Sequence, residues 1–104
     1  MQNYYRIKSI LHSGKLGERG TTRTDNYNLL RVNRIIKFDD HVCNGDIQVG
    51  LPMMAQYIED ANGNTISWGF CTSTVVDWDY IYKDTIRVET LNTIYEFEKI
   101  SLEI

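Results

Sequence analysis

Residues 13–23, SGKLGERGTTR, are the part of the chain best suited to bind an anion. Glycine recurs there at every third position, at Gly14, Gly17 and Gly20, with basic side chains between and after the glycines. Glycine allows backbone N–H groups to approach a phosphate closely, and arginine binds phosphate oxygens in a planar, two-pronged geometry. The segment therefore predicts a mobile basic loop that captures phosphate.

The same segment also has a simpler interpretation, as a connector between two strands. It is not a Walker A loop, because no Gly-Lys-Ser/Thr follows the glycine spacing. It is not a dinucleotide-binding fingerprint, because the spacing is GxxGxxG and no helix is predicted after it to supply a dipole. Three glycines make a pliable hairpin loop whose charges keep it solvated, so both interpretations stay open here.

Two arginines on the next predicted strand extend the positive field of this loop. Hydroxyl groups on a later strand are expected to complete the pocket. The predicted ligand is a small anion, in particular a phosphate-bearing nucleotide, and no cofactor is expected. The candidate ligand-binding residues are Lys15, Arg19, Thr22, Arg23, Arg31, Arg34, Thr72, Ser73 and Asn92.

The chain has no recognisable catalytic signature, and a non-enzyme is predicted. Its two histidines, His12 and His41, fall in neither a GxSxG nor a Cys-His pattern, so nucleophilic catalysis has no support. Asp77 and Asp79 share one face of a predicted strand, where paired carboxylates can do acid–base work. A solvated strand face explains them more simply.

No metal site is predicted. Two histidines and two cysteines match a Cys2His2 count, but Cys43 and Cys71 lack the close paired spacing of structural zinc sites. Residues 38–46, FDDHVCNGD, lack the ligand spacing and the final glutamate of an EF-hand, so a polar turn is predicted there. Neither cysteine belongs to a CxxC pair, which favours a reduced, cytoplasmic protein.

Charge is divided unevenly along the chain. Residues 1–38 carry eight Lys/Arg and two Asp/Glu, whereas residues 39–104 carry three Lys/Arg and twelve Asp/Glu. The split favours two halves that pair across a sheet, and it also permits a basic patch facing a partner, or a homo-oligomer. The net charge of -3 opposes duplex binding. Trp68 and Trp78 could stack bases, but alternation places most aromatic residues in the core, so nucleic acid ranks third.

With 104 residues, of which 42% are apolar and 12% aromatic, the chain is expected to form one globular domain, residues 1–104. No stretch is long and apolar enough to span a bilayer. The first ten residues lack the apolar segment of a secretory signal. A membrane partner is therefore not expected.

Alternation with a period of two dominates residues 66–82 and predicts β-strand. The run is longer than a usual strand, so we expect a bend or bulge near residues 71–74 that divides it between two strands. Before it, Asn62-Gly63 favours a type I′ hairpin turn. The resulting apolar face pairs Tyr57 with Trp68, Ala55 with Phe70 and Met53 with Thr72.

A second hairpin is predicted in residues 84–99. A four-residue loop at residues 90–93 sets apolar residues opposite one another on one face and opposite charges on the other, which supports this register. The predicted pairs are Val88 with Tyr95, Ile86 with Phe97, Arg87 with Glu96 and Asp84 with Lys99.

The N-terminal third fits the same plan. Residues 4–12 alternate, and residues 28–38 form a strand with an apolar face that Arg34 interrupts. Either a bulge shifts this pattern or the arginine points into the interior. Since no segment has a sustained helical period, we predict an all-β fold of five to seven antiparallel strands, as a small SH3-like or OB-like barrel or a compact sandwich.

One short C-terminal pattern is shared with other proteins. Its residues are Thr72, Ser73 and Val75, then Thr90, Asn92, Thr93 and Tyr95. The pattern resembles that of small uncharacterised β-rich proteins of bacteria and their phages, in which Thr-Ser-x-Val precedes a strand ending Thr-x-Asn-Ser/Thr-x-Tyr. The resemblance implies a small all-β protein and carries over no catalytic residue and no substrate.

Two functions from different classes agree with these observations. The first is a non-enzymatic binding protein for a small phosphorylated ligand, such as a phage-type, homo-oligomeric protein that sequesters a nucleotide signal. The second is a protein-interaction module, an inhibitor or an adaptor, that uses charged faces or an exposed strand edge.

Overall fold

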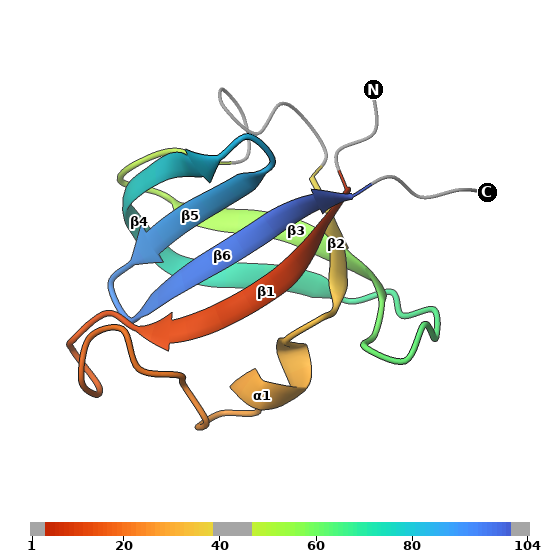
Figure 1. Ribbon diagram of the computed structural model, residues 1–104, viewed down its shortest axis with the longest axis horizontal. Helices are drawn as coiled ribbons and strands as arrows, with labels where there is room; N and C mark the ends of the chain where they lie inside the picture. Colours follow the sequence, from red (N-terminus) through yellow and green to blue (C-terminus); the bar gives the residue numbers. More distant parts are fainter. Residues whose placement is uncertain (1–3, 39–46, 101–104) are drawn as a thin grey trace.

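The computed structural model describes residues 4–38 and 47–100. Within them, six antiparallel strands form a closed barrel in which each strand pairs with the next and β1 also pairs with β6 (Figure 1). The predicted all-β fold is confirmed. No helix in these residues is long and apolar enough to cross a membrane. The elements are β1 (Tyr4–His12), α1 (Asn28–Arg31), β2 (Ile35–Lys37), β3 (Pro52–Glu59), β4 (Gly69–Tyr82), β5 (Thr85–Thr90) and β6 (Thr93–Ile100).

Aromatic and branched apolar side chains fill the barrel interior. Phe70 packs edge to face against Tyr57 and Tyr95, with ring centroids 5.3 and 5.4 Å apart. Its third ring neighbour, Phe97, lies 6.3 Å away. Edge-to-face contact is favourable because the positive edge of one ring meets the negative face of the other. In a small barrel filled in this way, a ligand site must lie at an end or on the outer surface.

The C-terminal hairpin of β5 and β6 has the predicted register. The confirmed pairs are Val88 with Tyr95, Ile86 with Phe97 and Arg87 with Glu96, and the Lys99 N–H donates to the Asp84 carbonyl at 2.7 Å. Four residues, 90–93, separate the last paired residues, Glu89 and Ile94, so the predicted loop length is also confirmed. Opposite charges meet on the outer face, where an Arg87 N–H donates to the Glu96 carboxylate at 2.9 Å.

The hairpin of β3 and β4 turns at the predicted place but with a different geometry. The Asp60 N–H donates to the Asn64 carbonyl at 2.9 Å, which leaves three residues in the loop. Gly63 has a φ of 86°, but Asn62 does not have the positive φ that a type I′ turn requires, so that prediction is wrong. The Asp60 carboxylate favours the observed turn because it accepts the N–H groups of Asn62 and Asn64, each at 2.9 Å.

Two of the three pairs predicted for this hairpin are present. Ala55 pairs with Phe70, and the N–H of Tyr57 donates to the Trp68 carbonyl at 2.8 Å. Met53 and Thr72 meet differently, because the Met53 N–H donates to the Thr72 side-chain oxygen at 3.0 Å instead of to a backbone carbonyl. The predicted core position of Trp68 is wrong, since this residue is 66% exposed.

β4 is a single strand of 14 residues that bends from its partner β3 to its partner β5 (Figure 1). The predicted bulge is confirmed, since the register shifts between the Met54–Cys71 and Pro52–Thr74 pairs. The predicted division into two strands is wrong, because the backbone stays extended through the bulge.

The strand predicted for residues 28–38 is wrong over its first half. Residues 28–31 form α1, which ends at Val32, where the backbone becomes extended, and Asn33 then adopts a φ of 70°, which resets the side-chain alternation. Ile35 and Ile36 are consequently both buried. Arg34 is partly buried at the junction, so it neither lies in the core nor extends an apolar strand face.

Candidate functional site

The glycine-rich loop is packed onto the barrel. The His12 N–H donates to the Thr21 carbonyl at 2.8 Å, and the Gly20 N–H donates to the His12 carbonyl at 2.9 Å, so the loop continues the β1 ladder. Gly17 lies directly against the His12 ring, where an added Cβ would be 2.7 Å from ring atoms. The glycine at this position therefore serves a close contact within the protein.

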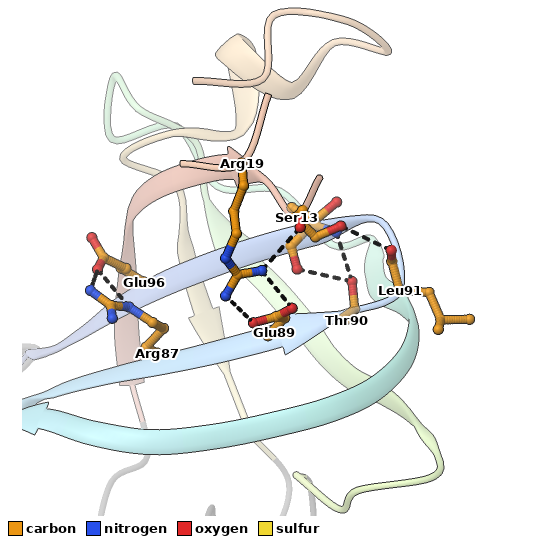
Figure 2. A network of polar contacts seen from close by, with 8 residues as sticks. Ser13, Arg19, Arg87, Glu89, Thr90, Leu91 and Glu96 are labelled. Carbon is orange, nitrogen blue, oxygen red and sulfur yellow. Dashed lines mark hydrogen bonds and ion pairs between the residues drawn. The ribbon is translucent and has the colours of Figure 1, made fainter. Parts of the chain in front are cut away.

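Arg19 fastens the same loop to β5 (Figure 2). Its two terminal nitrogens donate to the two carboxylate oxygens of Glu89 at 2.8 and 2.7 Å, and one of them also donates to the Ser13 carbonyl at 3.0 Å. The hydrogen bond from Arg19 holds the pKa of Glu89 below its ordinary value. The Ser13 hydroxyl donates to the Leu91 carbonyl at 2.9 Å, so the loop is attached to both β5 and the β5–β6 turn.

Arg23 has internal partners as well. It is 6% exposed, and its guanidinium donates to both carboxylate oxygens of Asp25 and to the Thr93 hydroxyl, the last at 2.7 Å. A buried cation needs such partners, because leaving it unpaired is costly. The hydrogen bond from Arg23 lowers the pKa of Asp25 from 3.8 to about 2.

We expect the protein to lose stability as the pH falls from about 4 to about 2. The depressed pKa of Asp25 means that its ionised form favours the folded state at every pH above the ordinary pKa of 3.8. Protonation of Asp25 as the pH falls toward its folded-state pKa of about 2 removes this contribution. Urea unfolding midpoints, compared at about pH 6 and about pH 2.5, measure the loss.

The matched variant for this prediction is Asp25→Asn. It should show a smaller fall in midpoint between the two pH values than the wild type, although Glu89 contributes to the fall that remains because its pKa is lowered too. An identical fall in the wild type and the variant would contradict the role given to the Arg23–Asp25 pair.

The turn that carries α1 contains three residues with positive φ. They are Asn26, Tyr27 and Asn33, at 51°, 62° and 70°. Asparagine tolerates this left-handed region, whereas a tyrosine rarely adopts it. The turn is fixed to β1, because the Asn33 N–H donates to the Ile7 carbonyl at 2.7 Å and the Ile7 N–H donates to the Arg34 carbonyl at 2.9 Å.

A pocket of about 350 Å³ is formed jointly by the α1 turn and the start of the β3–β4 hairpin. We call it the Tyr57 pocket. It combines aromatic rings with two guanidinium groups, a composition that suits a ligand with both an aromatic part and a negative charge. The lining residues are Tyr27, Leu30, Arg31, Arg34, Tyr57, Trp68 and Gly69.

The arginines of this pocket differ from those of the loop. Arg31 donates to the side-chain oxygen of its neighbour Asn28 at 3.3 Å, and the guanidinium carbon of Arg34 lies 4.9 Å from the ring centroid of Tyr57. Within residues 4–38 and 47–100, neither makes an ion pair with a carboxylate. Neither guanidinium is therefore paired directly with an acidic side chain that the structure describes, although the charge of Arg34 contributes to lowering the pKa of Asp60.

Two buried polar atoms at this pocket lack a hydrogen-bond partner among the described residues. They are Nε of Arg34 and the hydroxyl oxygen of Tyr57. Burial raises the pKa of Tyr57, while the nearby charges of Arg31 and Arg34 and a weak polar contact with Arg34 offset part of that rise. Tyr57 thus remains a neutral hydroxyl with donor capacity toward a ligand.

The other predicted site residues are not brought together with Arg31 and Arg34. Thr72 uses its hydroxyl within the sheet, donating to the Ser73 carbonyl at 2.7 Å. Asn92 accepts the Ser13 N–H through its backbone carbonyl at 3.4 Å. Lys15 is exposed, and Thr22 forms an isolated antiparallel β-bridge with Leu11. The predicted set therefore splits, with Arg19 and Arg23 held by acidic partners and only Arg31 and Arg34 in the Tyr57 pocket.

Sequence reasoning missed the aromatic walls of this pocket. Tyr27 was not singled out, and Tyr57 and Trp68 were predicted as core residues. A usable signal was the position of Trp68 near the start of its alternating row, close to the turn of the hairpin. The α1 turn gave no comparable signal, because its left-handed tyrosine contradicts residue preference.

Several predicted features lie outside the described residues. His41, Cys43 and the rest of the predicted polar turn at residues 39–46 belong to this group, so the absence of zinc stays a prediction. In the part of the chain that the structure describes, no three His, Cys, Asp or Glu side chains are grouped as metal ligands. Asp77 and Asp79 are both exposed, as expected for a solvated strand face.

The basic and acidic halves of the chain do pair across the sheet. Lys8 lies 3.8 Å from Glu98, and Arg19 lies 2.7 Å from Glu89, so each pair joins the N-terminal third to the acidic remainder. The predicted pairing of the two halves is confirmed at these positions.

Comparison of the chain with protein-family models, with curated proteins and with solved structures finds no match. The resemblance to small bacterial and phage proteins therefore stays a prediction. The geometry of the Tyr57 pocket is the feature that bears on function.

Proposed function

We propose that this protein is a non-enzymatic binding protein for a small phosphorylated ligand, and that the ligand occupies the Tyr57 pocket. The observation that carries the proposal is the pairing pattern of the arginines. Arg19 and Arg23 have carboxylate partners, whereas Arg31 and Arg34 share a pocket with aromatic rings and have no such partner among the described residues.

The energetics of a buried guanidinium support this choice of ligand. A partly buried cation is costly unless a hydrogen-bonding anion accompanies it. The ring of Tyr57 compensates Arg34 in part through a cation–π contact, but Nε of Arg34 keeps its unused donor. A phosphate supplies the missing acceptor oxygens and the missing negative charge together.

A protein-interaction module remains the alternative proposal. It is favoured by Leu29 and Leu30, two exposed apolar side chains on α1, of which Leu30 also lines the pocket. Each described strand has a neighbour on both sides in the closed barrel, so a partner would dock on side chains of the α1 face instead of adding a strand to an edge.

The biological setting belongs to the same proposal. We place the protein in a reducing, cytoplasmic compartment, because neither cysteine occurs in a CxxC pair and Cys71 is free. A homo-oligomeric, phage-type protein that sequesters a nucleotide signal is the setting in which a binder without catalysis has a clear use.

A thermal-shift panel tests the proposal. Phosphate, nucleoside mono-, di- and cyclic phosphates, and short oligonucleotides are each added to the full chain. A ligand that binds the folded state alone raises the melting temperature, by an amount that increases with its concentration relative to Kd. We expect a rise with at least one small phosphorylated compound. No rise with any of them, together with capture of a protein partner that depends on Leu29 and Leu30, would favour the interaction module.

A further inference from the structure

We infer that the Tyr57 pocket selects a single nucleoside phosphate, with the base stacked on Trp68 and the phosphate held by Arg31 and Arg34. The inference rests on the proposed function and deepens it, because it names the class of ligand and the residue that distinguishes a base from a bare phosphate.

The position of Trp68 is the first observation. It is the hairpin partner of Tyr57, which is 4% exposed, yet its own indole is 66% exposed. The next residue on its face of β4, Phe70, is buried in the aromatic core. The indole thus lies outside the core, although Phe70 and Ile66 on either side of it in the alternating row pack into or against the core, and it lines the pocket beside the two arginines.

The conformation of Tyr27 is the second, independent observation. This residue has φ 62° and ψ 17°, a left-handed conformation that is strained for a bulky side chain, and it is 78% exposed. Packing within the protein does not explain a strained and exposed aromatic residue. Strained residues cluster at ligand sites, where the strain positions a side chain for contact. Tyr27 lines the same pocket as Trp68 and offers a second aromatic surface.

The size of the pocket limits the ligand. About 350 Å³ lies near the lower end of the range of small-molecule sites, roughly 300–1,000 Å³. One nucleoside phosphate fits this space better than a dinucleotide does. The unpartnered Arg34 Nε and Tyr57 hydroxyl add two hydrogen-bonding groups next to the guanidinium charges, which suits a phosphate joined to a polar sugar.

The test uses adenosine 5′-monophosphate and ribose 5-phosphate, which share the sugar phosphate and differ in the base. Titration calorimetry on the full chain should give tighter binding of the nucleotide. Trp68→Ala should weaken nucleotide binding by about 10-fold or more, in line with the contribution of base stacking on an aromatic ring. Binding of ribose 5-phosphate should not change, because Trp68 contacts only the base.

Quenching of tryptophan fluorescence by the nucleotide is a second measurement of binding, and it distinguishes a loss of binding from a loss of folding. The nucleotide should quench emission in the wild type and in Trp78→Phe, whose remaining indole is Trp68. It should leave emission nearly unchanged in Trp68→Phe, which keeps an aromatic ring at the site. Asparagine tolerates the left-handed conformation, so Tyr27→Asn should leave the melting temperature unchanged and weaken the binding of the nucleotide.

The outcomes separate this inference from the proposed function. If ribose 5-phosphate binds as tightly as the nucleotide and Trp68→Ala changes neither, the inference is wrong and a phosphate site remains. If a dinucleotide or an oligonucleotide binds at least 10-fold tighter than the mononucleotide, the single-nucleoside limit is wrong. If the nucleotide, the sugar phosphate and inorganic phosphate all fail to bind the folded wild type, the proposed function fails with the inference.

Discussion

Replacement of Arg34 by alanine is expected to weaken nucleotide binding by roughly 10- to 100-fold while the barrel stays folded. A hydrogen bond that involves a charged group contributes about 1.5–3 kcal/mol, and Arg34 offers a phosphate both its charge and an unused Nε donor. Its contact with the Tyr57 ring is a local cation–π interaction at the rim of the barrel, so its loss should lower stability only modestly. Calorimetric titration of wild type and variant measures the affinities.

Arg19→Ala is the matched control, since it removes an arginine whose guanidinium is already bonded to Glu89. Nucleotide affinity should be unchanged in this variant. Equal losses in both variants would point back to the glycine-rich loop as the binding element. A large loss of stability in Arg34→Ala, with no response of the wild type to any nucleotide, would leave the interaction module as the better account.

Phe70→Ala is expected to lower the free energy of unfolding by about 3–5 kcal/mol, the usual cost of deleting a large aromatic side chain from a core. Phe70 packs against Tyr57, Tyr95 and Phe97. Since small domains are stable by about 5–15 kcal/mol in total, a measurable fraction of the variant should be unfolded at room temperature. Urea unfolding followed by circular dichroism measures the change.

Trp68→Ala is the control, two residues earlier in the chain and on the same face. Its exposed indole should cost less than about 1 kcal/mol, as surface substitutions usually do. Equal costs for the two variants would mean that Trp68 packs into the core, which would remove one wall of the Tyr57 pocket and contradict its proposed role in binding.

The C-terminal hairpin was predictable because its evidence is local. Arg87 and Glu96 have opposite charges, and the apolar residues on either side of each match in the same register. A one-residue slip would send each apolar side chain to the wrong face. The alternation within each strand and the packing of the strands in the barrel therefore favour the same pairing of residues. This pairing also sets the length of the turn between the two strands.

The start of the chain was harder, because single residues shift the pattern there. The register shift between Ile7 and Ser9 moves burial from alternate residues to Ile7 and Ile10. The left-handed conformation of Asn33 has the same effect before β2. A bulge adds one residue to a strand, and a positive φ changes the backbone direction at one residue. The alternation on each side of either feature therefore still looks regular in the sequence.

The sequence predicted the chemistry of the candidate site, an anion bound by arginines, but not its location in the fold. Both Arg31 and Arg34 were expected to bind an anion, and they line the Tyr57 pocket. The pairing of Arg19 with Glu89 joins residues far apart in the chain, and nothing near Arg19 in the sequence marks that partner. Whether an arginine is neutralised or available depends on such distant contacts, which alternation and spacing do not encode.

The pairing of β1 with β6 constrains the order in which the molecule is assembled. Tyr4 is the Cα partner of Ile100, so β1 finds its second neighbour only after the chain has been synthesised as far as β6. Contacts of such large sequence separation form late and slowly, because a long loop of chain must be closed first. The walls of the Tyr57 pocket come from residues 27–69. Phe70, which packs against Tyr57, nevertheless reaches its final packing against Tyr95 and Phe97 only when β6 is in place. A ligand of this pocket would therefore bind the closed barrel and would not bind a chain in which β6 has not yet paired with β1.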